Sequence, residues 1–109
     1  MRIWDIPPKK LCRNHLLGEH RELHAIWSVI TKNKKGYSKH PETLRWNGKL
    51  RSLYARHEEL VEEMRNRGNN HKSKLPIRLA TGSKKQDYYV DSVKDQINIL
   101  KSKKCGCKV

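Results

Sequence analysis

The stretch EHRELHAIW, from Glu19 to Trp27, places two carboxylates among histidines and an arginine. The surrounding chain is strongly basic, with 25 Lys and Arg against 11 Asp and Glu and a formal net charge of +14. Two interpretations are open for these carboxylates. Either both are ordinary solvated helix residues, or one of them is a working acid at the edge of a site built for an anion.

Glu22 is the stronger candidate for such an acid. With about 100° per residue, His15, Gly18 and Glu22 lie within about 60° of one another on a helix and border its apolar face. Gly18 leaves a gap between the imidazole and the carboxylate, where a ligand or another segment could approach. Partial desolvation at such an edge raises the pKa of a carboxyl group and suits it to proton transfer. The alternative is a structural Glu22, bonded to a neighbouring Arg or a loop amide.

Metal and thiol chemistry have less support in the sequence. His20 and His24 lie four residues apart and could share a metal, but a third ligand would have to come from elsewhere, and HRELH differs from the H-E-x-x-H zinc pattern. Cys12, Cys105 and Cys107 form neither a disulfide framework nor a four-ligand zinc site, so we expect reduced thiols without an assigned role. The sequence therefore predicts no metal and no cofactor.

The α-amino group is the least ordinary nucleophile of the chain. Its reference pKa is about 7.7–8.0, against about 10.4 for lysine, so it is far more often neutral at cellular pH. Because Arg2 is bulky, Met1 should be retained, and the free amine would be that of Met1 itself. The chain has no Gly-rich phosphate loop, serine nucleophile elbow or paired metal-binding aspartates.

Three helices are predicted to position these groups, in an all-α fold. The first runs from about Lys9 to Thr31 and opens after Pro7-Pro8, residues suited to a helix start. Apolar residues at helical spacing predict its core face: Cys12, Leu16, Leu23, Ile26, Trp27 and Ile30.

The second helix has the clearest pattern, with apolar steps of three and four from Trp46 to Met64 and a stop at Gly68. Its exposed face is predicted to carry Arg56, Glu58, Glu59, Glu62, Glu63, Arg65 and Arg67. A polar loop over residues 69–85 leads to a third helix from about Gln86 to Lys101, and a basic tail follows. We therefore expect one small domain over residues 1–109, with an extended N-terminus, a long loop between the second and third helices, and that tail.

The charge indicates a polyanion as partner, and nucleic acid is the leading candidate for a protein of this size. A merely soluble basic surface and an anionic membrane surface are the alternatives. The chain lacks both an apolar run of about 18 residues and the apolar core of a signal peptide. These features favour a cytoplasmic, nucleoid-associated protein.

Four stretches of the chain form a recognisable set: MRIW at the start, HLLGEHREL at residues 15–23, LRSLYARHEELVEEMRNRG at residues 50–68 and NNHKS at residues 69–73. Together they resemble the endonuclease V-like family of pyrimidine-dimer DNA glycosylases with apurinic/apyrimidinic (AP) lyase activity. The first is similar to the family's N-terminal start, and the second to its first-helix motif of a His followed six and seven residues later by Arg-Glu. The third is similar to the family's second helix and its glycine stop, and the fourth resembles a loop motif of the shorter cellular members.

The resemblance implies a mechanism. The Met1 amine would attack C1′ of the damaged nucleotide, release the base and form an imine with the opened sugar. Glu22 would stabilise the developing positive charge and then move protons during β-elimination, which cuts the strand. Arg21 and Arg2 would hold backbone phosphates, and His15 would line the pocket near the amine.

Further phosphate contacts are expected from Lys72, Lys84 and Lys85. The expected partner is damaged double-stranded DNA, bound by a monomer with no obligatory protein partner. This chain departs from the pattern of the family's phage enzyme in its retained Met1 and in its KSKKCGCKV tail. The substrate is therefore left open among pyrimidine dimers, other lesions and abasic sites.

Two other functions remain open on the sequence. One is a non-enzymatic basic three-helix protein that binds DNA or RNA through phosphates alone, and the other is a small ribosome-associated protein. The enzymatic hypothesis requires residues 1–8 to fold back across the first helix, and we expect Ile3 and Trp4 to pack against the bundle and hold the amine in place.

Overall fold

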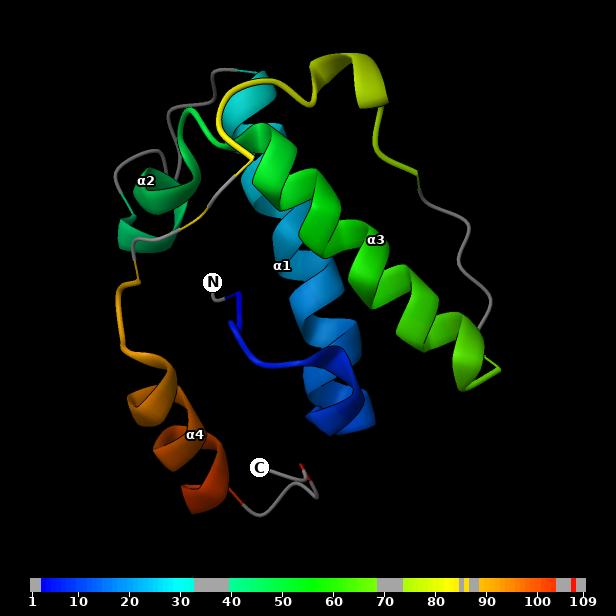
Figure 1. The fold of residues 1–109 in the computed structure, drawn as a ribbon, viewed down its shortest axis with the longest axis vertical. Coiled ribbons are helices and arrows are strands. Elements are labelled where there is room, and N and C mark those ends of the chain that lie inside the picture. The colour runs from blue at the N-terminus through cyan, green and yellow to red at the C-terminus, as the bar shows by residue number, and fades with distance from the viewer. Residues whose placement is uncertain are drawn as a thin grey trace.

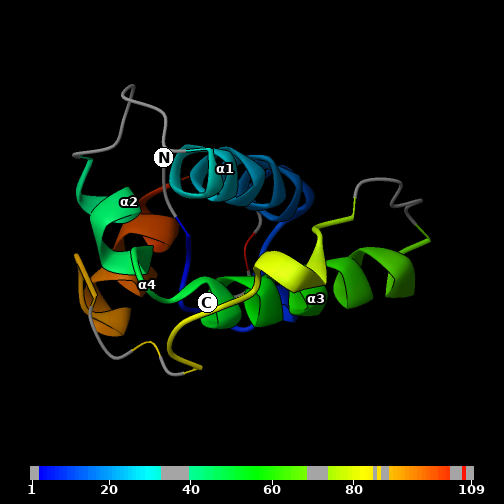
Figure 2. The same ribbon diagram turned by 90° about the horizontal axis from the view of Figure 1, so that it is seen from above.

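Two long helices cross each other and carry most of the fold (Figure 1). The computed structural model describes residues 3–32, 40–68, 74–84, 86, 89–103 and 107. Within these residues the chain forms four α-helices and two short 3-10 turns: η1 (Pro8–Lys10), α1 (Arg13–Thr31), α2 (Pro41–Trp46), α3 (Leu50–Asn66), η2 (Ile77–Leu79) and α4 (Val93–Ser102). Seen from above, α1 and α3 form two layers, and α2 and α4 lie beside them on one side (Figure 2). The predicted all-α class is confirmed.

The helix boundaries correct the sequence prediction in three places. The first predicted helix is interrupted, because a 3-10 turn precedes α1, which begins only at Arg13. A short helix that was not predicted, α2, precedes α3; Pro41 occupies its first turn, and the His40 side chain accepts a hydrogen bond from the Glu42 N–H. The last helix begins at Val93, later than predicted, because the Ser92 hydroxyl caps its first turn through the Asp95 N–H at 3.1 Å.

The core lies between α1 and α3 and is closed by residues 3–7, which we call the N-terminal segment. Leu16, Leu23 and Ile26 of α1 meet Leu53 and Leu60 of α3, and all five are fully buried. The prediction that Ile3 and Trp4 pack against the bundle is confirmed, because both belong to the same buried cluster. In Figure 1 this segment, in dark blue, runs between α4 and α1.

A loop contact fixes the start of α3. Lys49 and Gly82 form an isolated antiparallel bridge, and the Ser83 N–H donates to the Gly48 carbonyl at 2.9 Å. Gly82 has a φ of +85°, in the left-handed region that favours glycine. A Cβ at this position would collide with the Gly48 carbonyl group, so both the conformation and the close approach require glycine.

Among the described helices, none is long and apolar enough to cross a membrane.

Replacing Gly82 tests the importance of this contact. We expect Gly82→Ala to lower the free energy of unfolding by about 2–4 kcal/mol, because the left-handed φ and the collision with Gly48 both cost energy. Gly68→Ala is the matched control: Gly68 also has a positive φ, of 81°, but a Cβ there meets open space. It should cost only about 1–2 kcal/mol. Equal losses in urea unfolding would contradict the role of the close approach.

Candidate functional site

Backbone N–H groups of the N-terminal segment are bound by side chains from three different helices. The N–H groups of Ile3, Trp4 and Asp5 all donate to side-chain oxygens within the fold. In that order, the acceptors are Glu42 of α2 at 3.2 Å, Glu19 of α1 at 2.9 Å and Gln96 of α4 at 2.8 Å. Because each bond comes from a different helix, the segment is held in one position relative to the whole bundle.

Glu19 is the most buried acidic residue of this network, with 2% of its surface exposed. Arg56 of α3 donates from Nε to Glu19 Oε2 at 2.7 Å and from Nη2 to Glu19 Oε1 at 3.1 Å. The same Nη2 donates to the Ile6 carbonyl at 2.9 Å. Together with the Trp4 N–H, Arg56 thus fills most of the acceptor positions of the carboxylate.

Burial raises the pKa of the Glu19 carboxyl group, and the charge and N–H groups of Arg56, with the Trp4 N–H, oppose that rise. All three hydrogen bonds to the carboxyl oxygens come from N–H donors, which is the pattern expected for an ionised carboxylate. Glu19 is therefore a structural anion that holds the segment.

A second buried ion pair, between Arg45 and Glu42, binds the segment at Ile3, one residue before Trp4. Arg45 Nε donates to Glu42 Oε1 at 2.6 Å, and Arg45 Nη2 donates to the Ile3 carbonyl at 3.0 Å and to Asp5 Oδ2 at 3.0 Å. Both peptide groups that flank Ile3 are thereby bound. The first described residue of the chain is among its most firmly held.

The predicted site residues of α1 lie on the neighbouring turns. Glu22 is half-buried, and none of the hydrogen bonds or ion pairs among the described residues involves it. Arg21 is exposed. His15 is half-buried, and its ring meets the Trp4 ring edge-on at a centroid distance of 5.7 Å. Burial, reinforced by the positive charge of Lys103, lowers the pKa of His15, so its ring is neutral at neutral pH.

Other predicted residues fall partly outside the described part of the chain. Met1, Arg2, Lys72 and Lys85 lie outside the described residues, so their predicted roles stay predictions.

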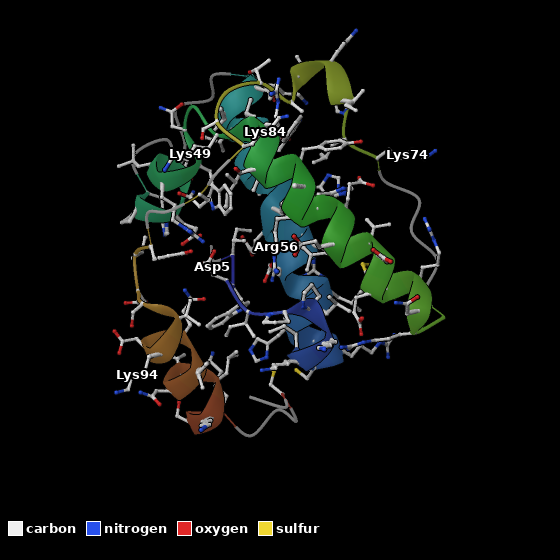
Figure 3. All side chains as sticks on the ribbon, viewed as in Figure 1. Asp5, Lys49, Arg56, Lys74, Lys84 and Lys94 are labelled. Atoms are coloured by element: carbon white, nitrogen blue, oxygen red, sulfur yellow. The ribbon has the colours of Figure 1, made fainter. Side chains whose placement is uncertain are left out.

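Lys84 is exposed and lines a hollow beside the N-terminal segment, together with Asp5, Arg56, Glu59, Gln86 and Tyr89. Figure 3 shows Asp5 and Arg56 near the centre of the molecule and Lys84 above them, near the start of α3. The hollow therefore combines an exposed cation with the buried network that holds the segment.

The sequence analysis missed the buried ion pairs and one histidine. Arg56 was assigned to the exposed face of its helix, but it is buried beside Glu19. The helical wheel groups Arg56 with other charged residues, and a sequence does not show that Glu19 of α1 and the Ile6 carbonyl meet its guanidinium group. The sequence also offered no third partner for His20 and His24, whereas His57 Nε2 lies 3.2 Å from His20 Nε2 and 3.1 Å from His24 Nε2.

Removing Arg56 tests the network. Arg56→Met leaves the Glu19 carboxylate buried without its cation, so we expect the free energy of unfolding to fall by about 3–5 kcal/mol. Arg51→Met, at an exposed position of the same helix, should stay within about 0.5 kcal/mol of the unmodified chain. Urea unfolding followed by circular dichroism measures both, and a loss below about 1 kcal/mol for Arg56→Met would overturn the structural assignment of Glu19.

Comparison with known proteins completes this description. A sequence model of the pyrimidine dimer DNA glycosylase family matches residues 1–76, which include Glu19, Glu22, Glu42 and Arg56. No curated protein and no solved structure matches the chain. The matched range contains α1, α2 and α3, whereas α4 lies beyond it. Because the match covers more than half of the chain, the chain belongs to the pyrimidine dimer DNA glycosylase family.

Proposed function

We propose that this glycosylase also acts as an AP lyase, through an imine formed by the Met1 amine. The single observation that supports this best is the binding of the Ile3, Trp4 and Asp5 N–H groups by three helices. A nucleophile at the end of a chain gains rate only if it is held near its target, and this network restricts the segment that carries it.

The amine would begin the reaction. Its lone pair attacks C1′ of the damaged nucleotide, and the bond from C1′ to the base breaks, with the base leaving on the electron pair and taking up a proton. Opening of the sugar ring then gives a protonated imine between C1′ and the Met1 nitrogen. An α-amine suits this chemistry because its reference pKa of about 7.7–8.0 leaves a useful neutral fraction at cellular pH.

Glu22 would supply the charge and the proton transfer. A carboxylate near the imine stabilises its positive charge and can then remove a proton from C2′. The electrons of that C–H bond form the C2′=C3′ double bond, and the 3′-phosphate leaves, which cuts the strand. Glu22 is a better candidate than Glu19 because Glu19 is fully engaged with Arg56 and Trp4, whereas Glu22 makes no ion pair among the described residues.

The substrate would be damaged double-stranded DNA, bound by a monomer. Arg2 and Arg21 would hold phosphates beside the lesion, and His15 would border the pocket. Many exposed basic side chains among the described residues would add a general attraction to the backbone: Lys9, Lys10, Arg13, Arg21, Lys32, Arg51, Arg65, Arg67, Lys74, Arg78, Lys84, Lys101 and Lys103.

Borohydride trapping on a duplex with one abasic site tests the imine. We expect a covalent adduct on the Met1 amine, located by mass spectrometry of the cross-linked peptide, and no adduct once an N-terminal extension blocks that amine. Strand cleavage by Glu22→Gln should fall about 10²–10⁴-fold, the usual contribution of a positioned acid or base. Glu62→Gln, an exposed carboxylate on α3, is the control and should cleave normally. Binding without any adduct would instead favour the non-enzymatic alternative.

The salt dependence of binding tests the phosphate contact assigned to Lys84. Each phosphate contact contributes about 0.9 to the slope of log affinity against log salt, so Lys84→Ala should reduce that slope by about 1. Lys94→Ala is the matched control, since Lys94 points outward from α4, well apart from Lys84 (Figure 3). Fluorescence anisotropy on a labelled duplex measures both slopes. An unchanged slope for Lys84→Ala would remove this residue from the interface.

A further inference from the structure

Three histidines converge where α1 meets α3. His20 and His24 lie one turn apart on α1, and His57 comes from α3. Their Nε2 atoms form a nearly equilateral triangle, with 3.2 Å between His20 and His57, 3.2 Å between His20 and His24, and 3.1 Å between His24 and His57. His57 is only 1% exposed, whereas the other two rings are half-buried.

Hydrogen bonds alone cannot satisfy this triangle. Each neutral imidazole nitrogen is either a donor or an acceptor, and a hydrogen bond needs one of each. With three atoms and two states, at least one pair must be alike, so that two lone pairs or two N–H groups face each other near 3.2 Å.

Glu58 sharpens the conflict. His57 Nδ1 lies 3.0 Å from Glu58 Oε1, so the proton of a neutral His57 belongs on Nδ1, and its Nε2 carries a lone pair toward the other two rings. Either both α1 histidines then donate to that lone pair while their own N–H groups face one another, or one of them presents a lone pair that faces the lone pair of His57. A cation at the centre removes the conflict, because all three nitrogens can then present lone pairs.

We propose that His20, His24 and His57 bind a zinc-class divalent ion that joins α1 to α3. At Zn–N distances of about 2.0–2.1 Å, two ligands of a tetrahedral zinc ion lie about 3.3 Å apart, close to the observed spacing. Neutral imidazole nitrogens suit zinc and its neighbours in the first transition row. A carboxylate on the far nitrogen, as Glu58 provides for His57, is the usual support of a histidine ligand. Solvent reaches the half-buried rings, so water can complete the coordination.

A different observation points independently to a second site, at the start of α1. Cys12 Sγ and Cys107 Sγ each lie 3.2 Å from His15 Nδ1, and the Cys12 N–H donates to Cys107 Sγ at 3.1 Å. This group joins the beginning of the first long helix to a residue 95 positions later. Two cysteine sulfurs and one imidazole nitrogen are typical zinc ligands. We infer that Cys12, His15 and Cys107 bind a second zinc-class ion.

This second ion would leave the proposed function of His15 possible. A metal on Nδ1 places the ring proton on Nε2, which then acts as a donor. The first site lies on different residues altogether, so the two proposals stand or fall separately. Neither depends on the imine mechanism.

Zinc stoichiometry tests both sites in one series on the full chain. The protein is stripped with a chelator, kept in a thiol-free reductant, given zinc alone, desalted and analysed for bound metal. We expect two zinc ions per chain for the unmodified protein, one for His24→Asn and one for Cys12→Ser. His40→Asn is the matched control, since it removes a histidine outside both groups and Asn can keep the cap of α2; it should keep both ions.

The variants decide each site on its own. Two ions in His24→Asn would overturn the three-histidine site, and two in Cys12→Ser would overturn the cysteine site. If the unmodified chain binds a single ion, the three-histidine site is overturned when His24→Asn still binds that ion. In the same case, the cysteine site is overturned when Cys12→Ser still binds it. His24 is chosen over the buried His57, whose replacement could unfold the protein, and circular dichroism checks that each variant is folded. Cobalt in place of zinc adds a second measurement, because only the cysteine site should show thiolate-to-metal absorption.

Two measurements test the role of the metal. Glu58→Gln should weaken zinc binding at the three-histidine site about 10–100-fold without removing a ligand. Added zinc should raise the melting temperature of the unmodified chain, because an ion that binds only the folded state stabilises it. The rise should be smaller in His24→Asn. An equal rise in the melting temperature of both proteins, or an unchanged zinc affinity in Glu58→Gln, would count against an ion that joins α1 to α3.

Discussion

The buried ion pair between Glu19 and Arg56 is the interaction on which the rest of the structure depends. Removing two charges from water is costly, and the cost is recovered only where hydrogen bonds saturate both groups. Here the Trp4 N–H binds Glu19 and the Ile6 carbonyl binds Arg56, so the N-terminal segment itself supplies hydrogen bonds that the buried pair needs. The pair therefore couples the packing of α1 against α3 to the position of residues 4–6.

The two glutamates of α1 differ in their partners. Glu19 faces the segment and is engaged by Arg56, whereas Glu22, three residues on, makes no ion pair among the described residues. Three residues correspond to nearly one helical turn, which carries the second carboxylate toward the edge of the apolar face. The basic chain supplies cations to both environments: Arg45 and Arg56 are buried in ion pairs, and many other Lys and Arg side chains among the described residues are exposed.

Periodicity predicted the helical class and most of the core face of α1, because burial of apolar side chains depends on spacing that a sequence displays. The packing of Ile3 and Trp4 was predicted from the requirement that residues 1–8 fold back across the first helix. Periodicity failed for Arg56, whose contact with Glu19 depends on how two helices cross, and for α2, which begins at a local cap. It also could not bring His57 to His20 and His24, since the crossing of two helices decides which residues meet. The predicted roles of Met1 and Glu22 came mainly from the family resemblance, and helical spacing added only that Glu22 lies near His15 and Gly18.

The bond between the Asp5 N–H and Gln96 joins residues 91 positions apart, and it has a consequence for synthesis. A ribosome releases residues 3–5 long before α4, so this segment lacks its last anchor for the whole of that interval. Until then Glu19 and Glu42 can hold it only in part. Residues 3–5 are thus made early, but their set of hydrogen bonds is completed only once α4 has emerged.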